Sequence, residues 1–341
     1  MKKLYTLSIA LLFAVSAFAQ QALWGGSQIV SPEINQDNSV TFRLHAPKAV
    51  KVQVTGDFLP TQKVETPFGS YDAPGYADLT EKDGIWEYTT APLGPELYSY
   101  SFIVDGLTIR DPSNVHMIRD VASVTNVFII GGGRSDLYKV NDVPHGTVSK
   151  VWYDSPTLGT DRRMTVYTPA GYEQNRKQKY PVFYLLHGAG GDEEAWMDLG
   201  RTAQILDNLI AQGKAEPMIV VMTNGNAGEC AAPGQCPEGF ERIPDMFEYV
   251  GLFSAAARFH DSSDCPVYQN EKAQIDAQFA KNPALYWIAI GDADFLYEEN
   301  VNLRKYLDEK GYPYEYVESD GGHIWRNWRI YLTEFVPKLF K

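Results

Sequence analysis

The sequence of 341 residues contains only three cysteines. Cys230 and Cys236 are six residues apart in a loop rich in Gly and Pro, a spacing that allows a small-loop disulfide and leaves Cys265 over. No histidine accompanies them at the spacing of zinc ligands, so we expect no metal site. The cysteines are therefore interpreted as structural or incidental.

Positive charge is also scarce. Lys and Arg number 30 against 43 Asp and Glu, which gives a formal net charge of −13 at pH 7. Nucleic-acid binding needs surfaces rich in Lys and Arg, so this balance argues against a nucleic-acid partner. A neutral or weakly charged substrate suits such a surface better.

Long apolar runs are absent except near the start of the chain. Lys2 and Lys3 precede the run Leu7–Val15, and Ala17-Phe18-Ala19 follows as an A-x-A cleavage site. The run is shorter than the roughly 20 residues of a bilayer span. We predict a signal peptide over 1–19, a secreted or periplasmic location, and no membrane span in the mature protein.

The rest is too long for one average domain and, at 44% hydrophobic residues, too apolar for disorder. From 22 to 130 the pattern is that of short strands. Val40, Phe42 and Leu44 alternate with polar residues, and Asp105-Gly106 is a strong hairpin-turn dipeptide. This predicts an immunoglobulin-like β-sandwich. The Gly-rich and polar stretch 131–146 is interpreted as a linker.

From 147 to 341 the pattern changes to short, continuous apolar runs separated by helical segments. The runs are Tyr180–Leu186, Pro217–Met222, Tyr249–Phe253 and Leu285–Ile290, and the helices are expected over 193–212 and 300–310. Such runs are typical of strands buried on both faces of a parallel sheet. The alternation predicts an α/β domain whose site lies at the carboxyl ends of the strands.

Three motifs follow the predicted strands. A Gly-rich turn, His187–Gly191, is suited to present backbone N–H groups as an oxyanion hole, although an ordinary tight turn has the same pattern. Asp294 follows Leu285–Ile290, where helix capping is the alternative role. His323 lies in a Gly-Gly turn, where a loop histidine without a role is the alternative. An acid followed by a histidine is the second half of a Ser…Asp…His order, whereas His187 is expected to pack or to support the loop.

The part from about Pro144 to Lys341 resembles the α/β-hydrolase esterases of the family 1 carbohydrate esterases, which include feruloyl and acetylxylan esterases. The stretches that carry the resemblance are Arg163–Tyr172, the loop LLHGAGG, GDADFLYE and GGHIWRNWR. The resemblance implies that Asp294 is the triad acid, His323 the base, and the N–H of Ala189, beside Gly188, the oxyanion donor. It also implies acyl groups of plant cell-wall polysaccharide as substrate, with no cofactor or metal.

The part before the linker looks like the early-set domain of family 48 carbohydrate-binding modules, through Trp86-Glu87-Tyr88 and Tyr100–Asp111. That likeness makes carbohydrate binding by the β-sandwich a second hypothesis, in which exposed aromatic side chains hold the sugar. Trp86 and Tyr98 are two such aromatic residues, with the protein core as the alternative place for each.

The serine of the triad is missing from its expected place. Esterases of this fold carry it in a G-x-S-x-G elbow between a strand and a helix, and no G-x-S-x-G occurs in this sequence. Residues 223–248, where the elbow is expected, are too few for a loop and an inserted strand with its crossover, which takes on the order of 30 residues. We therefore expect an internal deletion that removed the nucleophile strand and elbow.

Ser254 is the best substitute nucleophile by chain order, because it ends a strand and precedes Asp294 and His323. Against this role, Leu252 occupies the position where an elbow needs a very small residue. Three hypotheses therefore remain open: an ester hydrolase, a catalytically inactive carbohydrate-binding protein, and the product of an internally deleted gene.

Overall fold

A computed structural model describes residues 29–66, 69–120, 123–156, 158–175, 177–188, 191–225, 247–256 and 270–341. The predicted signal peptide, the three cysteines and the predicted oxyanion donor Ala189 lie outside the described residues, as does most of the loop expected to lack the elbow.

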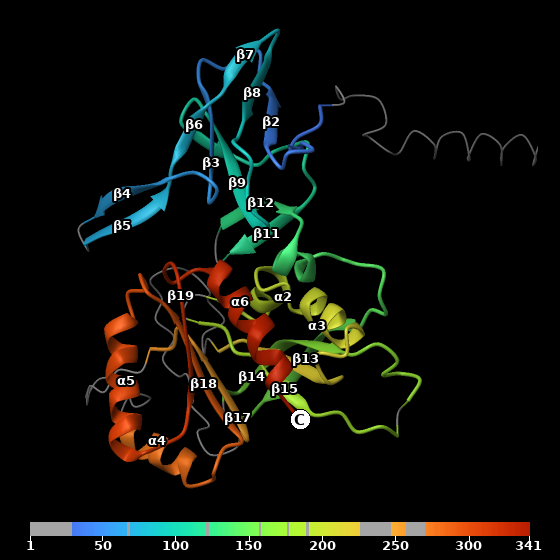
Figure 1. Ribbon diagram of the computed structural model, residues 1–341. Helices are drawn as coiled ribbons and strands as arrows, with labels where there is room; N and C mark the ends of the chain where they lie inside the picture. The colour runs from blue at the N-terminus through green and yellow to red at the C-terminus, as the bar shows by residue number, and fades with distance from the viewer. Residues whose placement is uncertain are drawn as a thin grey trace, which may run out of the picture.

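The first part of the chain is built from two antiparallel sheets (Figure 1). One has the order β1 (Glu33–Ile34), β2 (Val40–His45), β8 (Ile85–Thr89) and β7 (Thr80–Lys82). The other has the order β11 (Met117–Asp120), β12 (Ser123–Ile130), β9 (Glu96–Val104), β3 (Val52–Gly56) and β6 (Tyr76–Asp78), with β10 (Leu107–Ile109) paired to β9. A separate hairpin joins β4 (Thr61–Thr66) to β5 (Gly69–Pro74).

Side chains that alternate along these strands form the core between the two sheets. Val40, Phe42 and Leu44 of β2 are buried together with Val52 and Val54 of β3, as the period of two predicts. The predicted turn Asp105-Gly106 joins β9 to β10, and both of its residues have positive φ. The strands expected between 22 and 130 are therefore present, and the immunoglobulin-like assignment of their arrangement remains a prediction.

The second part contains a mixed sheet and a parallel sheet. The mixed sheet has the order β13 (Thr147–Ser155), β14 (Thr160–Thr168), β16 (Ile219–Thr223) and β15 (Val182–Tyr184), in which only β15 and β16 are parallel. The parallel sheet has the order β17 (Tyr249–Phe253), β18 (Leu285–Gly291) and β19 (Glu315–Ser319). The strands in the four apolar runs pair in parallel as predicted, β15 with β16 and β17 with β18. The predicted parallel sheet is extended by β13 and β14, which are antiparallel because a short turn joins them.

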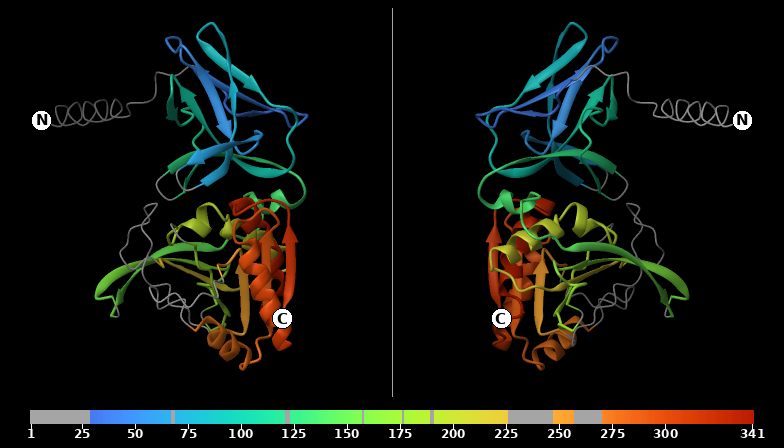
Figure 2. Two further views of the ribbon diagram at one scale, coloured as in Figure 1. Left: turned by 90° about the vertical axis from the view of Figure 1, so that its left-hand side faces the viewer. Right: turned by 90° about the vertical axis from the view of Figure 1, so that its right-hand side faces the viewer.

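Helices cover these two sheets (Figures 1 and 2). They are α2 (Ala195–Asp198), α3 (Thr202–Ala211), α4 (Glu271–Phe279), α5 (Tyr297–Lys310) and α6 (Trp325–Phe335), with the short 3₁₀ helices η1 (Gly133–Tyr138) and η3 (Val336–Lys338). The single helix expected over 193–212 is two helices, because Gly200 packs against Trp196 and Arg201 adopts positive φ. The helix expected over 300–310 begins earlier, at Tyr297.

The two sheets of the second part face each other through their end strands β15 and β17. No strand pairing among the described residues joins them. Phe183 of β15 and Phe253 of β17 both contact Phe335 of α6, with ring centroids 6.0 and 5.6 Å away. Helix α6 therefore bridges two strands that are not hydrogen-bonded to each other.

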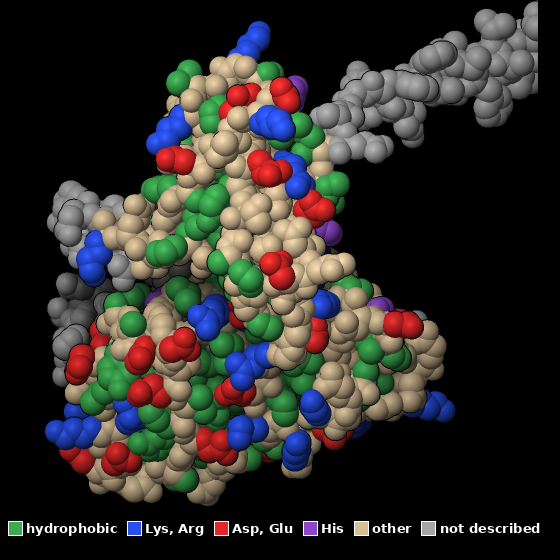
Figure 3. Space-filling model, turned by 45° about the horizontal axis from the view of Figure 1, so that its top comes forward, with side chains coloured by type: hydrophobic (Ala, Val, Ile, Leu, Met, Phe, Trp, Pro, Cys, Tyr) green, Lys and Arg blue, Asp and Glu red, His purple; other side chains and the backbone are tan. Residues whose placement is uncertain are grey.

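The two parts of the chain share a core. Tyr138 of η1 is fully buried in one apolar cluster with Leu97 and Ile118 from the first part and Tyr167 and Trp287 from the second. The stretch 131–146, interpreted as a linker, therefore contains a packed element. Acidic and basic side chains are interspersed on the face of the second part in Figure 3. Within the described ranges, no helix combines the length and the apolar character that crossing a bilayer requires.

Candidate active site

Asp294 and His323 meet at the carboxyl ends of two adjacent strands. Gly291 of β18 pairs in parallel with Ser319 of β19, so the loops that follow both strands lie side by side. His323 Nδ1 is 3.0 Å from Asp294 Oδ2 and 3.2 Å from Oδ1. Because a carboxylate only accepts hydrogen bonds, Nδ1 carries a proton, so in the neutral imidazole the lone pair is on Nε2. This is the tautomer that a general base needs.

The surroundings of Asp294 favour its charged form, although its side chain is buried. Burial raises the pKa of this carboxyl, but the hydrogen bonds from His323 and from the N–H of Leu296, together with the nearby hydroxyl of Ser254, outweigh it, and the pKa is lowered. Asp294 is therefore ionised at neutral pH and holds the imidazole in one orientation.

Three residues that the sequence did not single out fix the loop of His323. Asp292 Oδ1 accepts a hydrogen bond from the N–H of Gly321 at 2.9 Å. The buried side chain of Asn327 donates to the carbonyl oxygens of Asp320 and Gly322, both at 3.0 Å. A Cβ on Gly291 would lie 2.0 Å from the carbonyl oxygen of Gly321, so only glycine allows this approach.

Ser254 lies beside the acid of the pair. It follows β17 with a φ of 51°, is buried, and donates its backbone N–H to the carbonyl of Ala289 at 2.8 Å. Its Oγ makes no hydrogen bond of ordinary length, yet it is near enough to Asp294 to help lower the pKa of that carboxyl. Because the Asp294 carboxylate faces Nδ1 of His323, this position does not favour Ser254 as the group activated by Nε2.

The loop that carries the predicted oxyanion site is held by His187. Its Nδ1 donates to the carbonyl of Gly188 at 2.7 Å, and its Nε2 accepts from the N–H of Gly225 at 2.8 Å. The ring is only 5% exposed, and burial lowers the pKa of this imidazole, so it stays neutral. Both nitrogens are occupied by the backbone, which agrees with the expected supporting role. The role of the Ala189 N–H remains a prediction.

A series of contacts between aromatic rings links the loop after β15 to His323. Trp196 donates its Nε1–H to the carbonyl of Leu186 at 2.9 Å and packs against Trp325, with ring centroids 5.1 Å apart. Trp325 contacts Trp328 at 4.9 Å, and Trp328 contacts the His323 ring at 4.8 Å. The loops after β15 and β19 therefore lie on the same edge of the molecule.

An exposed aromatic side chain flanks the candidate base. Phe295 follows Asp294 directly, and its ring is 72% exposed with its centroid 4.6 Å from that of His323. Phe295 therefore offers an exposed apolar surface beside the His323 ring. No cluster of metal-ligating side chains is found among the residues that the structure describes.

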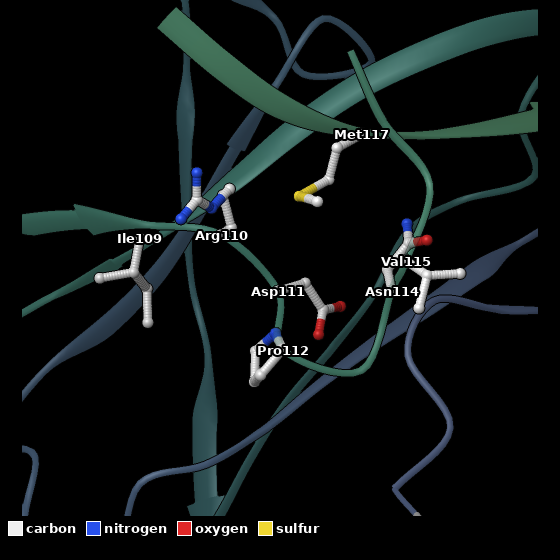
Figure 4. A pocket seen from close by; sticks show the side chains of 7 residues that line it. All are labelled: Ile109, Arg110, Asp111, Pro112, Asn114, Val115 and Met117. Atoms are coloured by element: carbon white, nitrogen blue, oxygen red, sulfur yellow. The ribbon is translucent and has the colours of Figure 1, made fainter. Parts of the chain in front are cut away.

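A cavity of about 480 Å³ lies elsewhere, in the first part of the chain (Figure 4). It is lined by residues between Ile109 and Met117. Its buried carboxylate, Asp111, accepts hydrogen bonds from Ser31 at 2.5 Å and Tyr100 at 2.8 Å. These partners give Asp111 a structural role, and the cavity includes no residue of the Asp294–His323 pair.

The aromatic residues considered as sugar platforms belong to the core of the first part. Trp86 packs on the apolar cluster between the sheets and donates its Nε1–H to the carbonyl of Ala46 at 3.0 Å. Tyr98 stacks on Phe128 with ring centroids 5.4 Å apart. The alternative reading of both residues as core residues is the one that the packing supports.

Comparison with known proteins points to esterases. Residues 155–243 match a family model described as "Putative esterase". A curated protein of Xylanibacter ruminicola named endo-1,4-beta-xylanase/feruloyl esterase is 26% identical over 361 aligned residues. That alignment covers 91% of this chain and 46% of the relative, so the chain spans about half of its length. Over most of its length the chain is therefore similar to a xylanase/feruloyl esterase.

Solved structures of esterases can also be aligned with this chain. The enterobactin esterase of Shigella flexneri aligns with a TM-score of 0.52 and 15% identity over 89% of this chain and 93% of its own. The chain thus shares its overall fold with this solved esterase. A ferulic acid esterase from Anaeromyces mucronatus, solved with ferulic acid, aligns with a TM-score of 0.48 and 21% identity over 59% of this chain and 93% of its own.

Proposed function

We propose that the protein is an exported carboxylic ester hydrolase that removes feruloyl or acetyl groups from plant cell-wall polysaccharide such as xylan. The observation that carries the proposal is the hydrogen-bonded pair of Asp294 and His323 at the ends of β18 and β19. The likeness to a xylanase/feruloyl esterase supports the substrate class. Export rests on the predicted signal peptide over 1–19.

The proposed organisation keeps the predicted boundaries, with a carbohydrate-binding-like sandwich over 22–130, a connection over 131–146 and an esterase-like part over 147–341. The two antiparallel sheets of the first part and the end of β12 at Ile130 support this division. Ala189 and Gly188 complete the proposed site as the oxyanion loop.

The chemistry follows from the orientation of His323. Asp294 holds Nδ1–H, so Nε2 takes a proton from the attacking oxygen as that oxygen bonds to the ester carbonyl carbon. The tetrahedral intermediate then expels the sugar oxygen, which receives the proton from Nε2. The products are the free acid and the sugar hydroxyl. With no G-x-S-x-G serine in the chain, the attacking oxygen is that of water.

We infer that a segment carrying the nucleophile strand and its elbow has been lost between β16 and β17. The support is that, among the described residues, β15 and β17 are end strands of separate sheets while α6 contacts both. An elbow strand between them would join the two sheets into one. In the serine-protease template the oxyanion hole and substrate binding alone retain about 10³–10⁴-fold acceleration over water. The activation of water by His323 is proposed to add to that acceleration.

The experiment compares hydrolysis of methyl ferulate and p-nitrophenyl acetate by the native protein and by His323→Ala. We expect the native protein to be faster. The matched control is His116→Ala, an exposed histidine of the sandwich, which should leave the rate unchanged. A native rate no higher than that of His323→Ala would overturn the proposal.

A second candidate function is polysaccharide binding without hydrolysis. The absence of a G-x-S-x-G serine favours it. Retardation of the protein in native gels containing xylan, together with equal rates for the native protein and His323→Ala, would support this function. Resequencing of the gene across the codons for Gly239 to Pro244 tests the third reading, in which an elbow-bearing segment appears in the true sequence.

A further inference from the structure

Trp152 differs from the other tryptophans that the structure describes. The other tryptophans among the described residues are buried or partly buried, whereas Trp152 is 66% exposed. A large apolar ring in water contributes little to the core, and exposed aromatic rings with charged neighbours are typical of binding surfaces. The exposed position of Trp152 therefore indicates a role in ligand binding.

Trp152 is on the outer edge of the mixed sheet, at the level of the candidate active site. It belongs to the end strand β13 and pairs with Arg163 of β14. The next residue of β14, Met164, pairs with Thr223 at the carboxyl end of β16. Trp152 thus lies near the sheet edge where the carboxyl ends of the parallel strands meet, on a hairpin that projects from the molecule (Figure 2).

The side chain under the ring is held firmly. The Arg163 guanidinium carbon is 5.8 Å from the centroid of the Trp152 ring. Its Nε donates to Glu193 at 2.6 Å and its Nη2 to Glu194 at 2.9 Å. Because Arg163 is fixed by two carboxylates, its cation–π contact holds Trp152 in one orientation at little entropic cost on binding.

The same charged cluster connects Trp152 to the candidate oxyanion loop. Glu193 and Glu194 follow the turn His187–Gly191 within three residues. Glu194 also pairs with Lys150, two residues before Trp152 on the same face of β13. An aromatic face is thus bordered by charged groups that can exchange hydrogen bonds with hydroxyl groups.

We propose that Trp152 is a stacking platform for a pyranose ring of the xylan backbone, at the opposite end of the strand order from the strands that carry Asp294 and His323. One face of a pyranose presents C–H groups, which pack on an aromatic ring, while the hydroxyl groups around its edge bind charged side chains such as Arg163 and Glu194. The choice of xylan rests on the proposed function. This platform is in the esterase-like part and is distinct from any binding by the sandwich.

Native gels containing soluble arabinoxylan test the platform, with xylohexaose binding measured by calorimetry. Trp152→Ala is expected to lose retardation and to bind xylohexaose about tenfold more weakly, and Trp152→Phe is expected to keep most of the binding. The matched control is Tyr76→Ala on β6 of the sandwich, whose ring is also about half exposed (51%) and should leave retardation unchanged.

Three results would overturn the platform: a native protein that is not retarded, equal retardation of the native protein and Trp152→Ala, or a loss confined to Tyr76→Ala. A change in oligomeric state of Trp152→Ala would also overturn it, since the ring would then cover a second copy. Methyl ferulate has no sugar, so its hydrolysis tests the proposed ester hydrolysis separately from glycan binding.

Discussion

Arg329 of α6 donates a hydrogen bond to Glu96 of β9 at 3.0 Å, across 233 residues of sequence. The same guanidinium donates to the carbonyl oxygens of Leu97 and Leu199 and lies over the ring of Tyr138. Helix α6 begins two residues after His323, so the first part of the chain is attached to the element that follows the candidate base.

Removing the charge of Glu96 should destabilise the whole chain. Both partners are mostly buried, and a buried ion that loses its partner costs about 3 kcal/mol. Glu96→Gln is therefore expected to lower the free energy of unfolding by about that amount. Urea denaturation followed by fluorescence measures it, and one transition covering both parts is expected.

The control for this prediction is Glu87→Gln. Glu87 pairs with Arg43 at 2.5 Å within the sandwich, but about half of its side chain is exposed. Exposed pairs contribute roughly 0–1 kcal/mol, so this variant should unfold almost like the native protein. Equal losses of unfolding free energy in both variants would show that the Glu96–Arg329 pair stabilises the fold no more than an exposed ion pair does.

Asn327→Ala should loosen the loop of His323. The substitution removes the hydrogen bonds of the buried amide to the carbonyl oxygens of Asp320 and Gly322, which contribute about 0.5–1.5 kcal/mol each, while Gly322 keeps the N–H of Ile324 as a donor. The proton on Nδ1 of His323, visible by NMR while it is bonded to Asp294, should exchange faster. Asn175→Ala, which removes an exposed amide, is the control and should leave that signal as it is. An unchanged signal in Asn327→Ala would argue against this positioning role.

The acid and the base of the site were predictable because each follows a strand directly. Asp294 comes after the apolar run of β18, and His323 follows β19, so their motifs are local in sequence. The residues that hold the loops of Asp294 and His323 in place were not predictable in this way. Asp292 bonds to Gly321, a residue 29 positions away, and nothing local to either residue marks that contact.

Whether an aromatic side chain is buried or exposed was likewise not predictable from the local sequence. Trp86 and Trp152 both lie in strand-like stretches of alternating pattern, and only the packing of a second sheet decides that the first is covered and the second is exposed. The break between α2 and α3 has a similar cause. Gly200 appears as one residue in a periodic helical pattern, but Trp196 occupies the space that a side chain there would need.

Gly291→Ala should be among the most damaging small substitutions at the site. Its Cβ would meet the backbone of Gly321, which cannot turn aside as a side chain can. We expect a loss of at least about 3 kcal/mol, the upper range for overpacking, together with loss of any hydrolysis that depends on His323. Thermal unfolding measures the stability. Gly94→Ala, where the nearest atom to the new methyl is Tyr98 Oη at 3.9 Å, should be close to native, and a mild effect at both positions would contradict the close approach.

His187 should make the stability of the fold depend on pH near neutrality. Burial lowers the pKa of this imidazole in the folded protein, and its Nε2 accepts from Gly225, which protonation would prevent. The unfolded chain therefore binds the proton more readily, so the stabilisation is complete above the unfolded pKa of about 6.5 and is lost as the pH falls below it. Urea denaturation at pH 7.5 and 5.5 measures this loss. His187→Gln should show a smaller difference between the two pH values than the native protein, whereas His116→Gln, on an exposed residue, should keep the native difference. The same pH difference in all three proteins would mean that His187 is not the titrating group.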